Sequence, residues 1–215
     1  MDKLLPGILK FRRKVFPACR ERFEELAGGQ SPSTLFITCS DSRIVPHLLT
    51  QTEPGELFVL RNAGNLVPPY DMEHSGEAAT IEYAVKALEV QDIVVCGHSH
   101  CGAMTGVLRP ELLQDLPAVE KWLVHAEQVR QEILNERLPV DGDDDPLTTA
   151  IKANILVQLD HLRTYPAVAD GESRGTLNLY GCFYRFESGD VNIYDAQSAR
   201  FVSVAETAAN KASIA

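Results

Sequence analysis

Three short runs of apolar, β-prone residues, separated by segments of helical periodicity, constrain the fold more than any other feature of this sequence. The runs cover residues 34–38, 57–60 and 93–96, and each has the length of a buried strand. Between the second and third runs, residues 75–88 place Ala, Ile, Val and Leu at helical spacing. Strand, helix and strand form the unit from which parallel sheets are built. The sequence therefore predicts an α/β fold with a central, mostly parallel sheet.

The remainder of the chain extends this pattern. Helices are expected over 117–135 and 147–163, and strands over 176–186 and 191–194 on either side of a turn at 187–190. We expect about four parallel strands, an antiparallel edge strand near the C-terminal hairpin, and helices on both faces. The acidic stretch 141–146 lacks the spaced ligands and terminal Glu of a calcium hand, which favours a loop that enters a helix.

The first 27 residues place apolar side chains among Lys and Arg at helical spacing, which predicts an amphipathic arm. Pro17 should split this arm into two helices, because proline removes a backbone donor. A length of 215 residues fits one domain. We therefore expect a single domain over 1–215, with the arm at 1–27, a core at 33–107, helices at 117–165 and C-terminal strands at 176–195.

Charge and hydropathy exclude several functional classes. Twenty basic residues against thirty acidic ones give a net charge of −10, which argues against a nucleic-acid partner. No apolar run approaches the roughly 18 residues that a membrane span needs, and the first residues do not resemble a secretion signal. These patterns predict a cytoplasmic protein that does not span a membrane.

Five cysteines are too widely spaced, and odd in number, for a disulfide framework, and no Cys-x-x-Cys motif suggests a thiol oxidoreductase. Cys39 follows the first predicted strand, and His98 and Cys101 follow the third. The carboxyl ends of neighbouring parallel strands meet at one edge of a sheet, so these three side chains can reach one ion. Two thiolates and one imidazole suit zinc, and three protein ligands leave a fourth position open for chemistry. The pattern predicts a catalytic zinc site.

Asp41 and Arg43 lie in the same loop as Cys39. A carboxylate and a guanidinium at this spacing can form a bidentate pair that orients a zinc-bound water. Histidines titrate near neutral pH, so His47, His74 and His100 are candidates by chain position for proton transfer, although each is more typical of a surface residue. The other cysteines, at positions 19, 96 and 182, are expected to be ordinary buried thiols.

The motifs Cys-Ser-Asp-Ser-Arg at 39–43 and Gly-His-Ser-x-Cys-Gly at 97–102 resemble those of β-class carbonic anhydrases. The stretches 29–32, 54–56, 61–62, 65–70 and 79–85 resemble the plant and cyanobacterial branch most closely. The resemblance implies one Zn²⁺ per chain bound by Cys39, His98 and Cys101, with Asp41 and Arg43 as the catalytic dyad. It implies a lyase that hydrates carbon dioxide reversibly to bicarbonate and a proton through zinc-bound hydroxide, a reaction of carbon utilization.

The same resemblance implies a substrate pocket built across a dimer interface. Its members here would be Gln30, Phe58, Tyr83 and the backbone of Gly102. The arm would reach across a partner subunit, which makes a homodimer the minimum unit and allows larger assemblies. Relatives that enter carboxysomes tend to carry a C-terminal extension, so the cytoplasm is favoured here over the carboxysome.

Two alternatives keep the zinc site and change its use. Carbonyl sulfide and carbon disulfide hydrolases resemble members of the same superfamily, and both substrates can be attacked by zinc hydroxide. A non-catalytic, zinc-stabilised interaction domain is a second alternative, and it would need a fourth protein ligand, for which Asp41 is the candidate.

Overall fold

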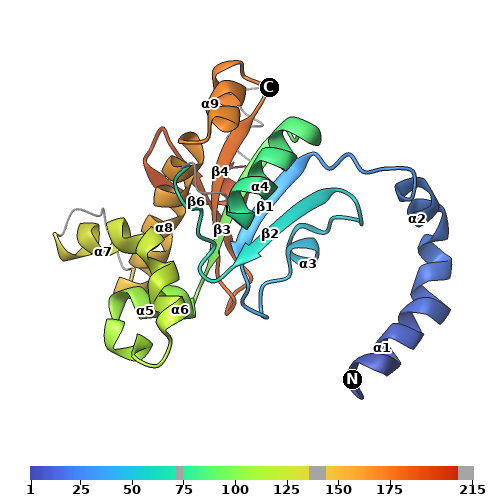
Figure 1. Ribbon diagram of the computed structural model, residues 1–215, viewed down its shortest axis with the longest axis horizontal. Coiled ribbons are helices and arrows are strands. Elements are labelled where there is room, and N and C mark those ends of the chain that lie inside the picture. Colours follow the sequence, from blue (N-terminus) through green and yellow to red (C-terminus); the bar gives the residue numbers. More distant parts are fainter. Residues whose placement is uncertain (71–74, 136–143, 208–215) are drawn as a thin grey trace.

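The computed structural model describes residues 1–70, 75–135 and 144–207. A six-stranded sheet in the order β2-β1-β3-β4-β5-β6 forms its centre (Figure 1). The strands are β1 (Thr34–Cys39), β2 (Leu57–Asn62), β3 (Asp92–His98), β4 (Asn178–Tyr184), β5 (Val191–Asp195) and β6 (Arg200–Ser203). The first four strands in space are parallel, and β5 and β6 are antiparallel. The predicted fold class is confirmed, and β6 lengthens the antiparallel edge beyond what the sequence pattern indicated.

Helices connect the parallel strands. Helix α3 (Pro46–Thr50) joins β1 to β2, and α4 (Gly76–Glu82), prolonged by a π-helical turn over Tyr83–Ala87, joins β2 to β3. Between β3 and β4 lie α5 (Gly102–Leu108), α6 (Pro117–Trp122), α7 (Glu127–Leu134), α8 (Pro146–Arg163) and α9 (Pro166–Ser173), with 3-10 turns at Pro110–Leu113 and Leu123–Ala126. The helix expected over 117–135 is thus divided into three pieces, and α3 and α9 were not predicted. The loop expected to enter a helix does so at Asp145, which caps α8, whereas residues 141–143 lie outside the described residues.

The two faces of the sheet are covered unequally. Leu35 and Ile37 of β1 point into the main core, which also contains Ile155 of α8. Phe36, between them, points to the other face and belongs to a small cluster with Ile44, against which Leu49 of α3 packs. Crossover connections between parallel strands are right-handed, so the direction in which the chain moves across the sheet decides which face a connecting helix covers. The chain moves one way from β1 to β2, which places α3 on one face, and the opposite way from β2 to β3 and on to β4, which places the helices of those connections on the other face. Within the described residues, one face of the sheet therefore has only a single short helix from its own chain.

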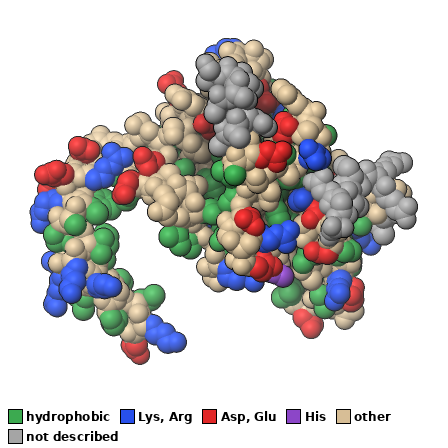
Figure 2. All heavy atoms as spheres, turned by 180° about the vertical axis from the view of Figure 1, so that it is seen from behind, with side chains coloured by type: hydrophobic (Ala, Val, Ile, Leu, Met, Phe, Trp, Pro, Cys, Tyr) green, Lys and Arg blue, Asp and Glu red, His purple; other side chains and the backbone are tan. Residues whose placement is uncertain are grey.

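The N-terminal arm extends away from the sheet (Figure 1). It consists of α1 (Leu4–Lys10), a π-helical turn over Phe11–Val15, a 3-10 turn over Phe16–Cys19 and α2 (Arg20–Leu26). Pro17 lies in the 3-10 turn, so the predicted division of the arm is confirmed. Apolar side chains remain exposed along it (Figure 2), among them Leu4, Leu5, Ile8, Leu9, Phe11 and Val15. Across the residues that the structure describes, no helix combines the length and apolar character needed to cross a bilayer.

Candidate metal centre and its surroundings

Three side chains with metal-ligand chemistry converge at the carboxyl ends of β1 and β3. Cys39 is the last residue of β1, His98 is the last residue of β3, and Cys101 immediately precedes α5. All three are buried, and their ligand atoms lie within 4.8 Å of one another. This is the only such group of His, Cys, Asp and Glu side chains found in the described part of the chain. The structure therefore brings together the three residues that the strand-end argument selected.

His98 is oriented as a ligand. Its Nδ1 lies 2.9 Å from the carbonyl oxygen of Ser99. A carbonyl oxygen can only accept, so Nδ1 carries the proton and Nε2 keeps its lone pair. Nε2 is buried and has no protein partner, a condition shared among the described side chains only by Asn65 Nδ2. A buried acceptor without a partner costs about 1–3 kcal/mol, and a metal ion at this position would satisfy it. The donor set and the orientation of His98 fit zinc.

The two cysteines interact directly. The hydrogen bond with Cys101 lowers the pKa of the Cys39 thiol, and the same contact, together with burial, raises the pKa of Cys101. The backbone N–H of Gly64 donates to Cys39 Sγ over 3.4 Å, which also favours the thiolate. The thiolate is the form that binds metal ions, so the pair is prepared to release protons when an ion binds.

Asp41 and Arg43 form a bidentate pair beside the two thiols. Arg43 Nε donates to Asp41 Oδ1 over 2.9 Å, and Nη2 donates to Oδ2 over 2.7 Å. Arg43 Nη2 also donates to the carbonyl oxygen of His100 over 3.1 Å. The hydrogen bonds from Arg43 hold the pKa of Asp41 well below its usual range, so the side chain is a carboxylate at neutral pH. The backbone N–H of Arg43 also donates to Oδ1 over 2.9 Å, so Oδ2 is the carboxylate oxygen with a further lone pair for a proton donor from the site.

Arg61, near the end of β2, holds the loop that carries Cys39 and Asp41. Its Nε and Nη2 donate to the carbonyl oxygen of Cys39 over 3.0 and 2.9 Å. Nη2 also donates to the carbonyl oxygens of Asp41 and Ile44 over 2.8 and 3.0 Å. The sequence motif included Arg61 without a role, because only the tertiary structure shows that its guanidinium reaches the neighbouring strand end.

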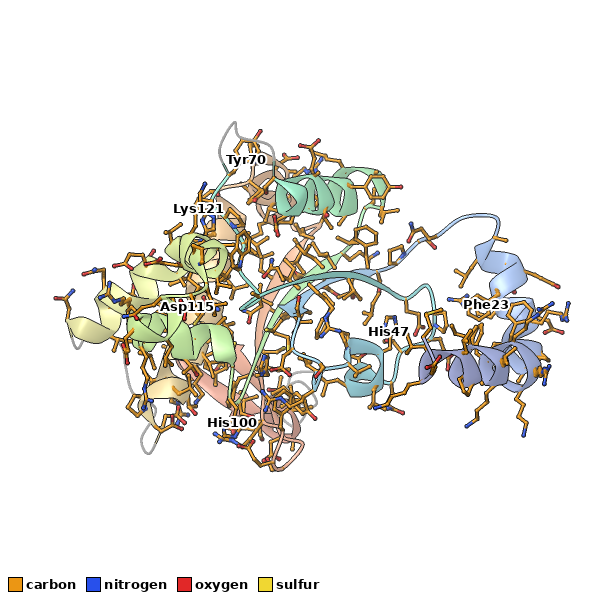
Figure 3. The ribbon with its side chains drawn as sticks, turned by 60° about the horizontal axis from the view of Figure 1, so that its bottom comes forward. Phe23, His47, Tyr70, His100, Asp115 and Lys121 are labelled. Atoms are coloured by element: carbon orange, nitrogen blue, oxygen red, sulfur yellow. The ribbon has the colours of Figure 1, made fainter. Side chains whose placement is uncertain are left out.

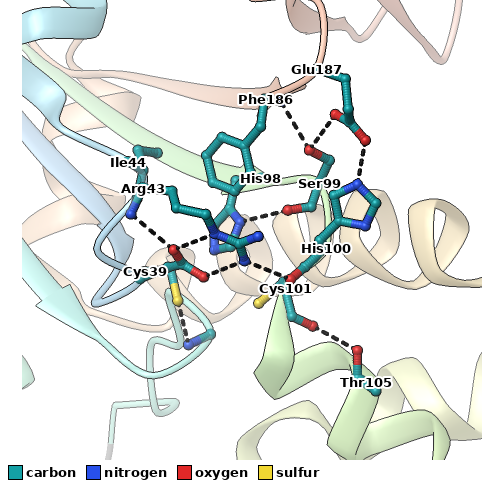
Figure 4. Close-up of polar contacts among 12 residues, drawn as sticks. Cys39, Arg43, Ile44, His98, Ser99, His100, Cys101, Thr105, Phe186 and Glu187 are labelled. Atoms are coloured by element: carbon teal, nitrogen blue, oxygen red, sulfur yellow. Dashed lines mark hydrogen bonds and ion pairs between the residues drawn. The ribbon is translucent and has the colours of Figure 1, made fainter.

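Residues that follow β4 complete the surroundings of the site (Figure 4). The ring of Phe186 stacks on His98, with the ring centroids 4.9 Å apart. Ser99 Oγ accepts from the backbone N–H of Phe186 and donates to the Glu187 carboxylate, both over 2.9 Å. The Glu187 carboxylate also contacts Nε2 of His100. Sequence patterns assigned this segment only to the end of a strand and a turn, since its proximity to the site depends on the pairing of β3 with β4.

The expected pocket residues do not all meet the metal centre within one chain. Phe58 and Tyr83 contact each other, with ring centroids 5.9 Å apart. Phe58 pairs with Leu35, whereas the site begins four residues further along β1 at Cys39, about 13 Å away at strand rise. Gln30 is exposed and precedes β1. Only Gly102, the residue after Cys101, lies next to the ligands. Three of the four residues thus lie toward the amino ends of the strands, opposite the site.

The remaining cysteines and histidines have separate environments. Cys96 and Cys182 face each other on β3 and β4, and burial raises the pKa of Cys182 to about 12. All five cysteines are free, and neither of these two belongs to the metal-ligand group. Among the histidines proposed for proton transfer, His100 borders the site and His47 is exposed on α3, where Figure 3 places it apart from His100. His74 lies outside the described residues.

Comparison with known proteins identifies relatives over nearly the whole chain. A family model described as carbonic anhydrase matches residues 34–191. A carbonic anhydrase of Synechocystis sp. is 48% identical over 204 residues, which cover 94% of this chain and 74% of the relative. The solved structure of the β-carbonic anhydrase CcaA superposes with a TM-score of 0.88 at 49% identity, covering 94% of this chain and 98% of that one. A structure described as one of two tetrameric β-carbonic anhydrases from Sordaria macrospora is 28% identical, with a TM-score of 0.76 over 90% of this chain and 97% of that one.

Proposed function

Because this chain belongs to the β-carbonic anhydrase family and is a zinc enzyme that reversibly hydrates carbon dioxide, we propose that Cys39, His98 and Cys101 are its zinc ligands and that Asp41 and Arg43 are its catalytic dyad. The observation that carries the proposal is the convergence of three buried ligand atoms beside one bidentate Asp–Arg pair. These residues would hold a zinc ion, which would supply a nucleophile near neutral pH by lowering the pKa of water to about 7.

Within this arrangement the protein orients the reaction. Arg43 keeps Asp41 ionised and fixes both carboxylate oxygens. Asp41 would accept a hydrogen bond from the nucleophilic oxygen and so would orient it toward the carbon of carbon dioxide. The Nδ1–H bond of His98 to Ser99 keeps Nε2 directed toward the ligand group. One zinc per chain follows from one such group among the described residues.

A second copy of the chain completes the substrate pocket in this proposal. Gln30, Phe58 and Tyr83 lie at the opposite end of the strands from their own metal centre, and the apolar arm extends away from its own core. Both features suit a homodimer in which each chain supplies these side chains to its partner. Gln30 would donate to a substrate oxygen, and Phe58 and Tyr83 would keep the pocket apolar for carbon dioxide. Gly102 would contribute its backbone beside the chain's own zinc.

The competing functions have no support in the geometry of the described residues. A non-catalytic zinc domain would need Asp41 as a closing ligand, whereas both of its oxygens are held by Arg43. No observation favours carbonyl sulfide or carbon disulfide as the substrate.

We place the enzyme in the cytoplasm, with a role in carbon utilization. All five cysteines are free, including Cys96 and Cys182 on neighbouring strands, which supports a reducing compartment.

The role of Asp41 is tested by Asp41→Asn. This change keeps the size of the side chain and removes the charged acceptor, so CO2 hydration should fall at least 100-fold in stopped-flow assays while zinc content stays near one per chain. The matched control is Asp160→Asn, which disrupts an exposed Asp–Arg pair with a 2.8 Å contact far along α8 and should leave hydration unchanged. Unaltered hydration in Asp41→Asn would remove Asp41 from the mechanism.

A further inference from the structure

The ring of Phe186 connects two parts of the site that the mechanism treats separately. The ring stacks on the imidazole of His98, with the ring centroids 4.9 Å apart and an interplanar angle of 29°. The guanidinium carbon of Arg43 lies 4.7 Å from the same ring centroid. Figure 4 shows the ring next to both groups. A single aromatic side chain therefore contacts both a metal-ligand candidate and the residue that holds Asp41.

Phe186 is itself held by the backbone and by its neighbours. Its N–H donates to Ser99 Oγ, and Ser99 is 3% exposed. The Ser99 N–H in turn donates to the carbonyl oxygen of Tyr184 over 2.9 Å, and the Tyr184 ring meets Phe186 edge to face at 5.2 Å. These contacts connect the residue after His98 to the end of β4. The ring of Phe186 is therefore a fixed surface.

The hydrogen bonds of Arg43 alone do not fully fix its guanidinium. Its side chain is 51% exposed, and the hydrogen bonds of its side chain go to Asp41 and to the carbonyl oxygen of His100. Hydrogen bonds from a guanidinium lie near its plane, so they restrict motion within the plane more than motion out of it. An aromatic ring attracts a guanidinium held near it and opposes displacement toward the ring. The Phe186 ring therefore restrains the out-of-plane motion of the Arg43 guanidinium, which the hydrogen bonds restrict less.

We propose that Phe186 is a positioning residue for the dyad: its ring, in contact with both His98 and Arg43, sets the place at which Arg43 holds Asp41 beside the metal centre. The proposal rests on the proposed roles of Asp41 and Arg43. It assigns no contact with substrate to Phe186, which acts through Arg43 alone.

The experiment compares Phe186→Leu, which keeps an apolar side chain and removes the ring face, with Phe186→Tyr, which keeps the ring. Phe201→Leu is the matched control, because it removes a ring that also has a cation nearby, Lys152 at 5.4 Å, but lies on β6. We expect kcat/KM for CO2 hydration to fall about tenfold in Phe186→Leu and to stay within about twofold of the natural enzyme in Phe186→Tyr and Phe201→Leu. Zinc content should remain near one per chain in all three.

A second readout does not depend on activity. In protein labelled with ¹⁵N-arginine, the Nε–H signal of Arg43, assigned by its loss in Arg43→Lys, should be displaced by the ring and should move in Phe186→Leu but not in Phe201→Leu. An unmoved signal in Phe186→Leu overturns the proposal, whatever the activity, and so does unchanged kcat/KM. Loss of zinc in Phe186→Leu also overturns it, since the ring would then be positioning His98. If the leucine variant does not fold, Phe186→Met is judged by the same outcomes. If the natural enzyme with full zinc shows no hydration, the proposed function fails, and the Arg43 signal still decides whether Phe186 positions the guanidinium.

Discussion

At the scale of single residues, the site depends on backbone conformations that few side chains tolerate. Gly64 has a φ of +84°, and its N–H donates to Cys39 Sγ. A Cβ at this position would lie 2.9 Å from Cβ of Ala103, the second residue of α5. Glycine thus allows the backbone to approach both a metal-ligand candidate and the helix that follows Cys101.

Gly64→Ala should therefore destabilise the protein by more than the positive φ of this residue alone explains. Gly189→Ala is the matched control, since Gly189 has a φ of +77° and a Cβ added there would meet open space. We expect Gly189→Ala to cost about 1 kcal/mol, and Gly64→Ala to cost about 2–4 kcal/mol because the added contact displaces the backbone. Thermal unfolding measures the difference. Zinc retention against a competing chelator should fall only in Gly64→Ala, and equal losses in both variants would contradict this account.

At the scale of elements, α8 supports the loop beside the metal centre. Asn154 Nδ2 donates to the carbonyl oxygen of Gly64 over 3.0 Å, and Gln158 Oε1 accepts from the N–H of Val67 over 2.7 Å. Both side chains are buried and lie on successive turns of one uninterrupted helix. The position of residues 62–67 therefore depends on a helix that begins more than 40 residues after the last ligand.

The start of α8 is set by Asp145, whose Oδ1 accepts from the N–H groups of Leu147 and Thr148. Asp145→Ala should reduce stability by about 0.5–2 kcal/mol at pH 7, whereas Asp145→Ser, which can also cap a helix, should lose much less. The hydrogen bond from Thr148 lowers the pKa of Asp145, so the stabilisation is present above the unfolded value of about 3.9 and is lost as pH falls below it. Thermal unfolding at pH 7 and at about pH 3.5 should show the gap between natural protein and Asp145→Ala narrowing at the lower pH. A gap independent of pH would show that the charge of Asp145 is not involved.

At the scale of the whole molecule, the chain leaves apolar surface that its own core does not cover. The arm exposes a series of apolar side chains, and α3, the only helix described on its face of the sheet, exposes Leu48 and is preceded by exposed Val45. Exposed apolar surface of this extent is typical of an interface. This distribution supports assembly of two or more chains, as the proposed pocket requires.

Ile8→Asp tests the arm directly. A charge in an apolar interface should weaken the assembly, so the mass measured by light scattering should shift toward the single chain of 23.7 kDa and hydration per chain should fall with it. Leu112→Asp is the control, because Leu112 and Ile8 are both 55% exposed, but Leu112 lies outside the arm. An unchanged mass in Ile8→Asp at micromolar concentration would show that the arm does not hold subunits together.

Much of the site was predictable from sequence because its signals are local. Apolar runs that end shortly before Cys39 and His98 mark two strand ends, and the chemistry of sulfur and imidazole selects zinc. The spacing of Asp41 and Arg43 predicts a pair that the structure confirms. The unequal cover of the two faces could not be obtained in this way, because it depends on the direction in which the chain crosses the sheet.

The order of amino acids was enough to establish which residue types stand at the ends of the strands, and with them the metal and the class of chemistry. Which distant residues surround those strand ends was settled by the fold. Arg61 reaches the Cys39 loop across one strand pairing, and Phe186 reaches His98 and Arg43 across another. The physical reason is that strand periodicity is a property of a few successive residues, whereas these contacts depend on the parallel register of β1 with β2 and of β3 with β4.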